Sequence, residues 1–318
     1  MMNDKIKTLF MGTPDFAQIS LAHLANADLC EIAGVVTQPD KPRGRGYALC
    51  PPPVKVFAQQ RGFPVYQPET LRCEAFTELL REIDPELIVV VAYGKLLPST
   101  VLHYPKYGCI NVHASLLPQY RGAAPIQRAI MEGRAETGVT IMFLNEGMDT
   151  GDMLQAVPVP IQENDNFACI HDRLAEAGAG ALLSTIEQLR AGTARPQKQD
   201  ERLATYAAKI EKEDREIDFL GMSAKEVHNL IRGLCPVPLA YTIHHGKTVK
   251  VIKSIVLDQN KTAGQPGEVL SVDRDIIAVA CRQGIIGLTE ILPEGKKRMS
   301  AGDFIRGRNT APGDRFGS

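Results

Sequence analysis

The chain has 318 residues, which is enough to bury a substantial core in one or two domains. Its composition, 44% hydrophobic and 23% charged, is typical of a soluble globular protein, and we expect a cytoplasmic protein that does not bind membranes. The formal net charge of −1 excludes binding of nucleic acid through overall charge, so any such binding has to use local patches.

Local patterns argue against several further classes. No run of about 18 apolar residues is present, so we expect no transmembrane helix. The N-terminal residues lack the apolar stretch of a signal peptide. The seven cysteines are odd in number and no pair has C-x-x-C spacing, so neither a disulfide framework nor a metal site is indicated.

The chain begins with alternating strand and helix patterns. A short apolar strand at 7–11 precedes a helix at 16–27 and a second buried strand at 32–37. This order predicts a parallel sheet with right-handed crossovers. Gly12 follows the first strand, but the G-x-G-x-x-G pattern of a dinucleotide site is absent.

Residues 38–53 are rich in proline, glycine and positive charge. The segment reads QPDKPRGRGYALCPPP, and its prolines and glycines predict an irregular loop. Its cations Lys41, Arg43 and Arg45 suit contacts with phosphate, although a solvated loop explains them equally well.

Two neighbouring strands of the predicted sheet lie further along the chain. Helices at 54–60 and 71–82 precede the wholly apolar segment LIVVVA at 87–92, which is typical of a central parallel strand. The next strand, 109–113, runs into a turn-rich loop. Because ligands bind at strand ends in open α/β sheets, we expect these two ends to lie side by side at a binding site.

The second half of the chain divides into two parts. A strand at 138–144 leads to an acidic loop at 146–152, and an Ala/Leu-rich helix covers 170–191. A polar segment at 191–207 then interrupts the periodicity, and we interpret it as a linker between domains.

The C-terminal part has the pattern of a small β-barrel. A helix at 223–234 begins with the capping-box pair Ser223 and Glu226. Short strands follow at about 240–244, 248–257, 267–272, 276–280 and 284–292. Strands of this length and spacing predict a barrel of the OB type, a fold that commonly binds nucleic acid.

The chemically informative residues gather around the strand at 109–113. Asn111 and His113 are two apart, so their side chains share one face of the strand. The following loop carries the cation Arg121, which could order the loop or meet a substrate, and the acidic loop carries Asp149. A single histidine at a strand end is more often structural. The hypothesis of a functional site therefore rests on the combination of His113 with Asn111 and the two following loops.

The same stretch resembles a known family signature. N-x-H-x-S-L-L-P at 111–118, a Gly/Ala/Pro loop and D-x-G-D at 149–152 resemble the folate-dependent formyltransferases. The resemblance implies an α/β, Rossmann-like parallel-sheet formyltransferase domain at 1–190, followed by the linker and the smaller barrel domain at 208–318. It implies 10-formyltetrahydrofolate as formyl donor, no metal, and catalytic roles for Asn111, His113 and Asp149. The cofactor-binding residues that it implies are Ser115, Leu116, Leu117, Pro118, Ala92, Tyr93, Gly94 and Leu97.

These residue types suit transfer of a formyl group to an amine. Negative charge develops on the carbonyl oxygen, and preorganised donors stabilise it by roughly 3–4 kcal/mol each. Asn111 supplies a neutral donor, and His113 can donate and move a proton. Asp149 can support the charged form of the imidazole or orient a water molecule.

The resemblance extends over nearly the whole chain to the branch that formylates methionine on initiator tRNA. In that branch a basic loop is implied to enter the acceptor stem, and Lys41, Arg43 and Arg45 match it. We expect a monomer with initiator methionyl-tRNA as partner. One alternative is a formyltransferase for a small amine, such as glycinamide ribonucleotide or an amino-sugar nucleotide. Another is a non-catalytic RNA-binding protein.

Overall fold

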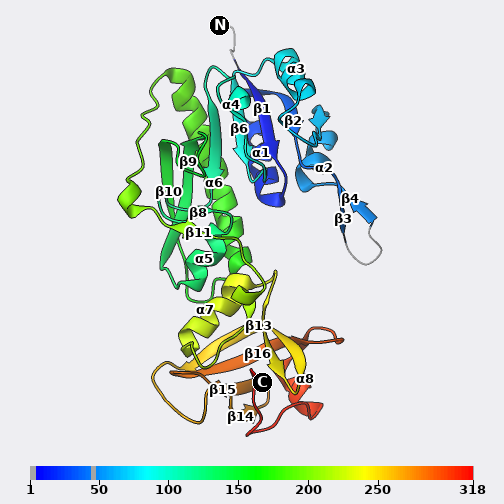
Figure 1. The fold of residues 1–318 in the computed structure, drawn as a ribbon, viewed down its shortest axis with the longest axis vertical. Helices are drawn as coiled ribbons and strands as arrows, with labels where there is room; N and C mark the ends of the chain where they lie inside the picture. Colours follow the sequence, from blue (N-terminus) through cyan, green and yellow to red (C-terminus); the bar gives the residue numbers. More distant parts are fainter. Residues whose placement is uncertain (1–4, 44–47, 318) are drawn as a thin grey trace. The chain divides into compact units, whose positions relative to one another are not determined.

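The computed structural model describes residues 5–43 and 48–317, which form two compact units (Figure 1). The first unit comprises the chain up to Gly122, Thr137–Val159 and His171–Tyr206. The second comprises Ala123–Glu136, Pro160–Ile170 and the chain from Ala207 onward. Among the described residues, no helix has both the length and the apolar character needed to cross a membrane.

A seven-stranded sheet forms the centre of the first unit, in the order β10-β9-β7-β6-β1-β2-β5. These strands are β1 (Ile6–Gly12), β2 (Cys30–Val36), β5 (Val65–Tyr66), β6 (Leu87–Val91), β7 (Cys109–His113), β9 (Glu136–Phe143) and β10 (Met153–Pro160). β1 is parallel to β2 and β6, and β6 is parallel to β7. β9 is antiparallel to β7, so the predicted parallel sheet is mixed at this end. A fully buried strand has the same apolar pattern in either orientation, which explains the difference.

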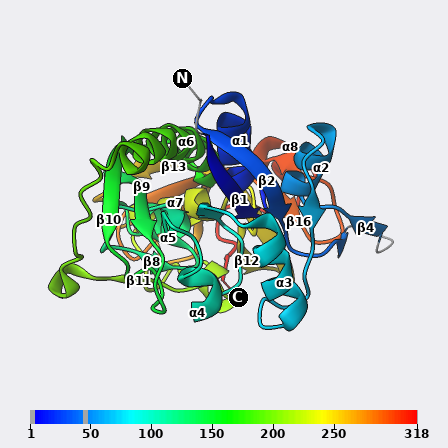
Figure 2. The same ribbon diagram turned by 90° about the horizontal axis from the view of Figure 1, so that it is seen from above.

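Helices cover both faces of this sheet (Figure 2). They are α1 (Asp15–Asn26), α2 (Pro53–Gln60), α3 (Glu74–Ile83), α4 (Ser99–Leu102) and α6 (Phe167–Ala191). Gly178 of α6 lies against Val112, so α6 covers the face to which that side chain points. The other face packs with α3 and α4 in a core that includes Leu80, Val101 and Cys109. Because side chains alternate along a strand, Asn111 and His113 share this second face.

The prediction of an irregular loop at 38–53 is wrong over two short stretches, which form strands. β3 (Lys41–Arg43) pairs antiparallel with β4 (Ala48–Cys50), and Pro42 lies opposite Leu49. Proline is tolerated on an isolated edge strand, because its missing N–H removes no bond from a larger sheet. The hairpin is anchored by Lys55, whose Nζ lies 2.8 Å from both carboxylate oxygens of Asp40. This contact lowers the pKa of Asp40.

The second unit joins two helices to an antiparallel sheet. The helices are α5 (Pro125–Met131) and α7 (Ala224–Leu234), and Gly233 of α7 lies directly against Met131. The predicted capping box is confirmed, since Ser223 and Glu226 each bond to the other's backbone N–H. The strands are β12 (Ala240–His244), β13 (Lys247–Asp258), β14 (Val269–Asp273), β15 (Ile276–Ala280), β16 (Ile285–Pro293) and β17 (Met299–Ser300), followed by α8 (Ala301–Arg306).

The C-terminal segment closes this sheet into a barrel. The strand order is β12-β13-β16-β15-β14, which leaves β12 and β14 at opposite ends. Phe316 forms a bridge with His244 at the end of β12, and Arg315 forms one with Glu268 just before β14. The backbone N–H of Phe316 also donates to Gly267 (2.8 Å). Residues 315–316 therefore fill the gap between the two edges, as a closed barrel requires.

Candidate active site

Asn111 and His113 lie at the end of β7, between a parallel and an antiparallel neighbour. Asn111 is opposite Val90 of β6 and Met142 of β9, and His113 is opposite Thr140. His113 is buried, whereas Asn111 is half-buried. Among the described residues, no group forms a hydrogen bond with the Asn111 side chain, so its amide N–H groups are available to a reactant.

His113 is held between a carbonyl and a carboxylate. Its Nε2 lies 3.0 Å from the carbonyl oxygen of Tyr120, which only accepts, so Nε2 carries a hydrogen and donates it. Its Nδ1 lies 3.6 Å from Oδ2 of Asp149, which is longer than a hydrogen bond. The predicted pair is therefore brought together, with Nδ1 directed at the carboxylate and without a hydrogen bond to any group of the described residues.

Asp149 itself is fixed at both its side chain and its backbone. Oδ2 accepts a hydrogen bond of 2.8 Å from the backbone N–H of Gly122, and the carbonyl oxygen accepts one of 2.8 Å from Nε2 of Gln199. The residue has φ of 53°, in the left-handed region. This region is sparsely populated by residues with a side chain, although aspartate adopts it more readily than most, and the surrounding contacts hold the backbone there.

The segment 115–118, predicted to bind the folate, is ordered by one buried hydroxyl. Oγ1 of Thr140 donates to the carbonyl oxygen of Ser115 (2.7 Å) and accepts from the backbone N–H of Leu117 (3.1 Å). Ser115 is buried and its hydroxyl donates to Gln119, whereas Leu116 and Pro118 are half-buried. Sequence reasoning missed Thr140, because one threonine in an apolar strand gives no distinguishing signal.

The other predicted folate segment, 92–97, follows β6 directly. Because β6 and β7 are parallel neighbours, this segment leaves the sheet at the same edge as residues 114–118. Ala92 and Gly94 are exposed and have φ of 45° and 83°, and Leu97 is half-buried. Tyr93 instead points into the core, where burial raises the pKa of its hydroxyl to about 12. The exposed part of this segment therefore consists of the backbone around Ala92 and Gly94 and the side chain of Leu96.

Arg121 orders the loop from inside the protein. Its side chain is fully buried and donates to both carboxylate oxygens of Glu201 (2.9 and 2.7 Å). It also donates twice to Oε1 of Gln199 (3.0 and 2.8 Å). Sequence reasoning left open whether Arg121 orders the loop or meets a substrate, and its burial favours the first. Gln199 and Glu201 were missed because they lie in a segment that looked like a plain polar linker.

The residues predicted to contact tRNA belong to the β3–β4 hairpin. Lys41 is exposed on β3, and Arg43 pairs with Ala48 through its backbone. Arg45, which matches the key arginine of the resembled branch, lies outside the described residues.

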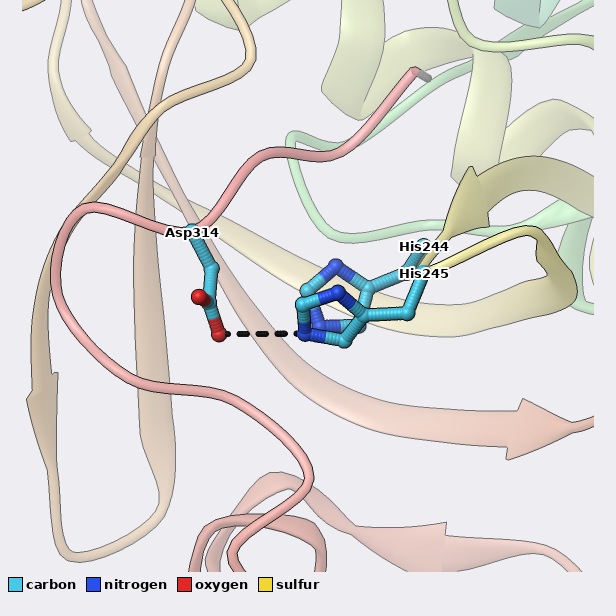
Figure 3. A group of neighbouring side chains, drawn as sticks. All are labelled: His244, His245 and Asp314. Atoms are coloured by element: carbon cyan, nitrogen blue, oxygen red, sulfur yellow. Dashed lines mark hydrogen bonds and ion pairs between the residues drawn. The ribbon is translucent and has the colours of Figure 1, made fainter.

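A separate polar cluster lies where the barrel closes. Figure 3 shows the rings of His244 and His245 one over the other, with Asp314 directed at His245 (3.3 Å). One potential metal-ligand atom of each residue lies within 4.8 Å of the others. However, the nitrogens of His244 already face the carbonyl oxygens of Arg315 (2.9 Å) and Asn309 (3.0 Å). A metal bound by His244 would have to displace one of these carbonyl contacts, so we assign the cluster a structural role in holding the C-terminal segment.

Comparison with known proteins identifies the family. The family model described as formyl transferase matches residues 4–186, and the model described as its C-terminal domain matches residues 209–309. The methionyl-tRNA formyltransferase of Bacillus licheniformis is 48% identical over 312 residues, which cover 98% of each chain. That of Geobacter metallireducens is 44% identical and covers 98% of this chain and 99% of its own.

A solved structure supports the fold. HypX from Aquifex aeolicus, in complex with tetrahydrofolic acid, superposes with a TM-score of 0.63 at 19% identity. The match covers 96% of this chain and 48% of HypX, so the likeness concerns about half of that protein. The two family models match the chain in order, and its relatives are similar along nearly their full length. The chain therefore belongs to the formyl transferase family.

Proposed function

We propose that this protein transfers the formyl group of 10-formyltetrahydrofolate to the α-amino group of methionine on initiator methionyl-tRNA. The observation that carries the chemistry is the meeting, at one strand end, of an imidazole, a carboxylate and an amide that has no partner within residues 5–43 and 48–317. Two relatives that match 98% of this chain, those of Bacillus licheniformis and Geobacter metallireducens, are methionyl-tRNA formyltransferases, which supports the choice of acceptor. We also propose a monomer that acts in the cytoplasm and needs no metal.

The residues fit a folate cosubstrate at this edge of the sheet. Ala92 and Gly94 present exposed backbone, and segment 115–118 lies at the neighbouring strand end. We assign both segments to the folate, with the formyl group directed at Asn111. The hairpin that carries Lys41 and Arg43 supplies positive charge for phosphates of the tRNA, together with Arg45.

In the proposed mechanism the α-amino nitrogen attacks the formyl carbon, and a new C–N bond forms. Asn111 donates a hydrogen bond to the oxygen that becomes negative, which stabilises the tetrahedral intermediate by roughly 3–4 kcal/mol. His113 uses Nδ1 to take the proton that the amine loses and to return it to the leaving nitrogen, N10 of the folate. The bond between the formyl carbon and N10 then breaks. Asp149 orients Nδ1 and attracts the proton while it is on the ring.

A formyl-transfer assay tests this proposal. The protein and 10-formyltetrahydrofolate are offered methionyl initiator tRNA, methionyl elongator tRNA and glycinamide ribonucleotide in parallel. We expect product on the initiator tRNA alone. Product on glycinamide ribonucleotide would support the formyl-transfer chemistry but contradict the proposed acceptor. If none of the three acceptors were formylated, the proposal would fail and the non-catalytic RNA-binding alternative would be favoured.

A matched pair of variants tests the assignment of Asn111. Asn111→Asp keeps the size of the side chain but replaces the donor with a negative acceptor, so kcat should fall by about 100-fold or more. Asn145→Asp makes the same change in the exposed loop and should retain most of the activity, because Oδ1 of Asn145 accepts bonds from Gly147 and Thr150 and an aspartate oxygen can do the same. Turnover of Asn111→Asp near that of the unchanged protein would refute the assignment.

A further inference from the structure

Gln199 uses its whole hydrogen-bonding capacity to connect two parts of the first unit. Its Oε1 accepts from Nε and Nη2 of Arg121 (3.0 and 2.8 Å). Its Nε2 donates to the carbonyl oxygens of Asp149 and Gly151 (2.8 Å each). A side-chain amide has two donors and one acceptor oxygen with two lone pairs, so no site on Gln199 is left over. The amide therefore has one orientation, and it fixes the carbonyls of the Asp149 loop relative to Arg121.

Arg121 is fixed in turn by the segment that contains Gln199. Glu201 binds the buried guanidinium with both carboxylate oxygens, which raises the pKa of Arg121. The backbone N–H of Arg121 donates to the carbonyl of Thr205 (2.9 Å), and that of Tyr120 donates to the Thr205 hydroxyl (2.8 Å). Segments 118–122 and 199–205 are thus joined by side chains and backbone together.

Both ends of Asp149 depend on this joined pair of segments. Its carboxylate accepts from the N–H of Gly122, the neighbour of Arg121, and its carbonyl accepts from Gln199. Its left-handed φ of 53° is unfavourable on its own, so these bonds determine where the carboxylate lies relative to His113.

We propose that Arg121 and Gln199 are positioning residues for formyl transfer, and that the series Glu201–Arg121–Gln199 sets the place of the Asp149 carboxylate opposite Nδ1 of His113. The inference rests on the proposed function and assigns this reaction two residues that touch neither substrate. A buried guanidinium that makes four hydrogen bonds is a rigid anchor, because each N–H that lost its partner would carry a desolvation cost.

Gln199→Glu tests the series at one atom. A glutamate keeps an oxygen for Arg121 but replaces the donor Nε2 with an acceptor that faces two carbonyl oxygens. The loop should shift, and kcat should fall by about 100-fold, since a misplacement of about 1 Å has an effect of that size. KM for tRNA should change less than threefold. Gln197→Glu adds the same charge two residues earlier on an exposed side chain and is the matched control.

A double-mutant cycle separates positioning from loss of structure. If Gln199 acts through Asp149, then Gln199→Glu should lower kcat less than threefold once Asp149→Asn is present. A purely structural role would give the same factor in both backgrounds, and that result, or a kcat of Gln199→Glu close to that of the unchanged protein, would overturn the inference.

Hydrogen exchange gives a readout that is independent of turnover. The amides of the peptide 145–152 should exchange faster in Gln199→Glu than in Gln197→Glu, with the rest of the first unit unchanged. If the unchanged protein formylates none of the acceptors, the proposed function fails. In that case unchanged exchange at 145–152 would separately refute the role of Gln199, and faster exchange confined to that peptide would support it.

Discussion

Thr140→Val isolates the hydroxyl that orders the predicted folate segment. Valine has nearly the shape of threonine, so packing in β9 is retained, and only the hydroxyl is lost. Thr140 is completely buried, and its hydroxyl serves the carbonyl of Ser115 and the N–H of Leu117. The substitution leaves both backbone groups without a partner in the interior.

The size of the expected stability loss follows from these two backbone groups. A buried donor or acceptor without a partner costs about 1–3 kcal/mol, so two of them predict a loss of about 2–6 kcal/mol in the free energy of unfolding. If segment 115–118 instead moves to find new partners, less stability is lost and the cost appears in folate binding. Each 1.4 kcal/mol there corresponds to about a tenfold higher Kd.

Two measurements on the same variant distinguish these outcomes. Urea denaturation gives the change in unfolding free energy, and calorimetric titration with tetrahydrofolate gives the change in Kd. Thr8→Val is the control, because Thr8 is equally buried but its hydroxyl contacts Ile6 within β1 and Cys30 on β2, away from segment 115–118. It should lose about 1 kcal/mol and bind folate unchanged. If the two losses for Thr140→Val together stay below about 1 kcal/mol, the reasoning is refuted.

Three other substitutions have defined outcomes. Tyr93→Phe removes a buried hydroxyl that has no hydrogen-bond partner among the described residues, so urea denaturation should show equal or about 1 kcal/mol higher stability; a clear loss would contradict this. Burial lowers the pKa of His228 below its usual value of about 6.5. The neutral side chain therefore contributes stability above about pH 6.5, and this contribution is lost as the pH falls below that value. His228→Asn, which can keep the bond to Ser254, should flatten the dependence of melting temperature on pH between 7 and 5, and an unchanged slope would oppose it. Asp149→Asn still accepts from Gly122 but lacks the charge, so kcat should fall by about 100-fold with KM little changed; a higher KM at full kcat would indicate a binding role.

The elements that sequence predicted well are those that local patterns define. The helix α7 begins at a capping box, and β15 has the predicted limits 276–280. Helix α8 was missed although Ser300 accepts from the N–H of Asp303 at its start. Six residues are too few for a periodic pattern to stand out.

Elements that depend on distant partners were not predictable in this way. The barrel is closed by residues 315–316, whose bridges to His244 and Glu268 leave no period in the sequence. In the candidate site, Asn111 and His113 followed from alternation along one strand, and Asp149 from the family resemblance. The residues that hold this site in place could not be predicted from the sequence, because Gln199 and Arg121 are 78 residues apart and both look like ordinary polar residues.

The buried cation also bears on where the catalytic unit ends. Sequence periodicity stops at 191, and a limit at 190 was predicted from it, whereas the contacts of residues 191–206 are with the first unit. Arg121 has no exposed surface, and its carboxylate partner Glu201 and amide partner Gln199 both follow that limit. Glu201 itself is largely exposed, but each buried guanidinium donor that lost its partner would cost about 1–3 kcal/mol, and several such donors amount to a large part of the stability of most domains. A catalytic unit that ended at 190 would bear this cost and would also lose the bonds to Asp149, so we infer that the functional unit extends at least to Thr205.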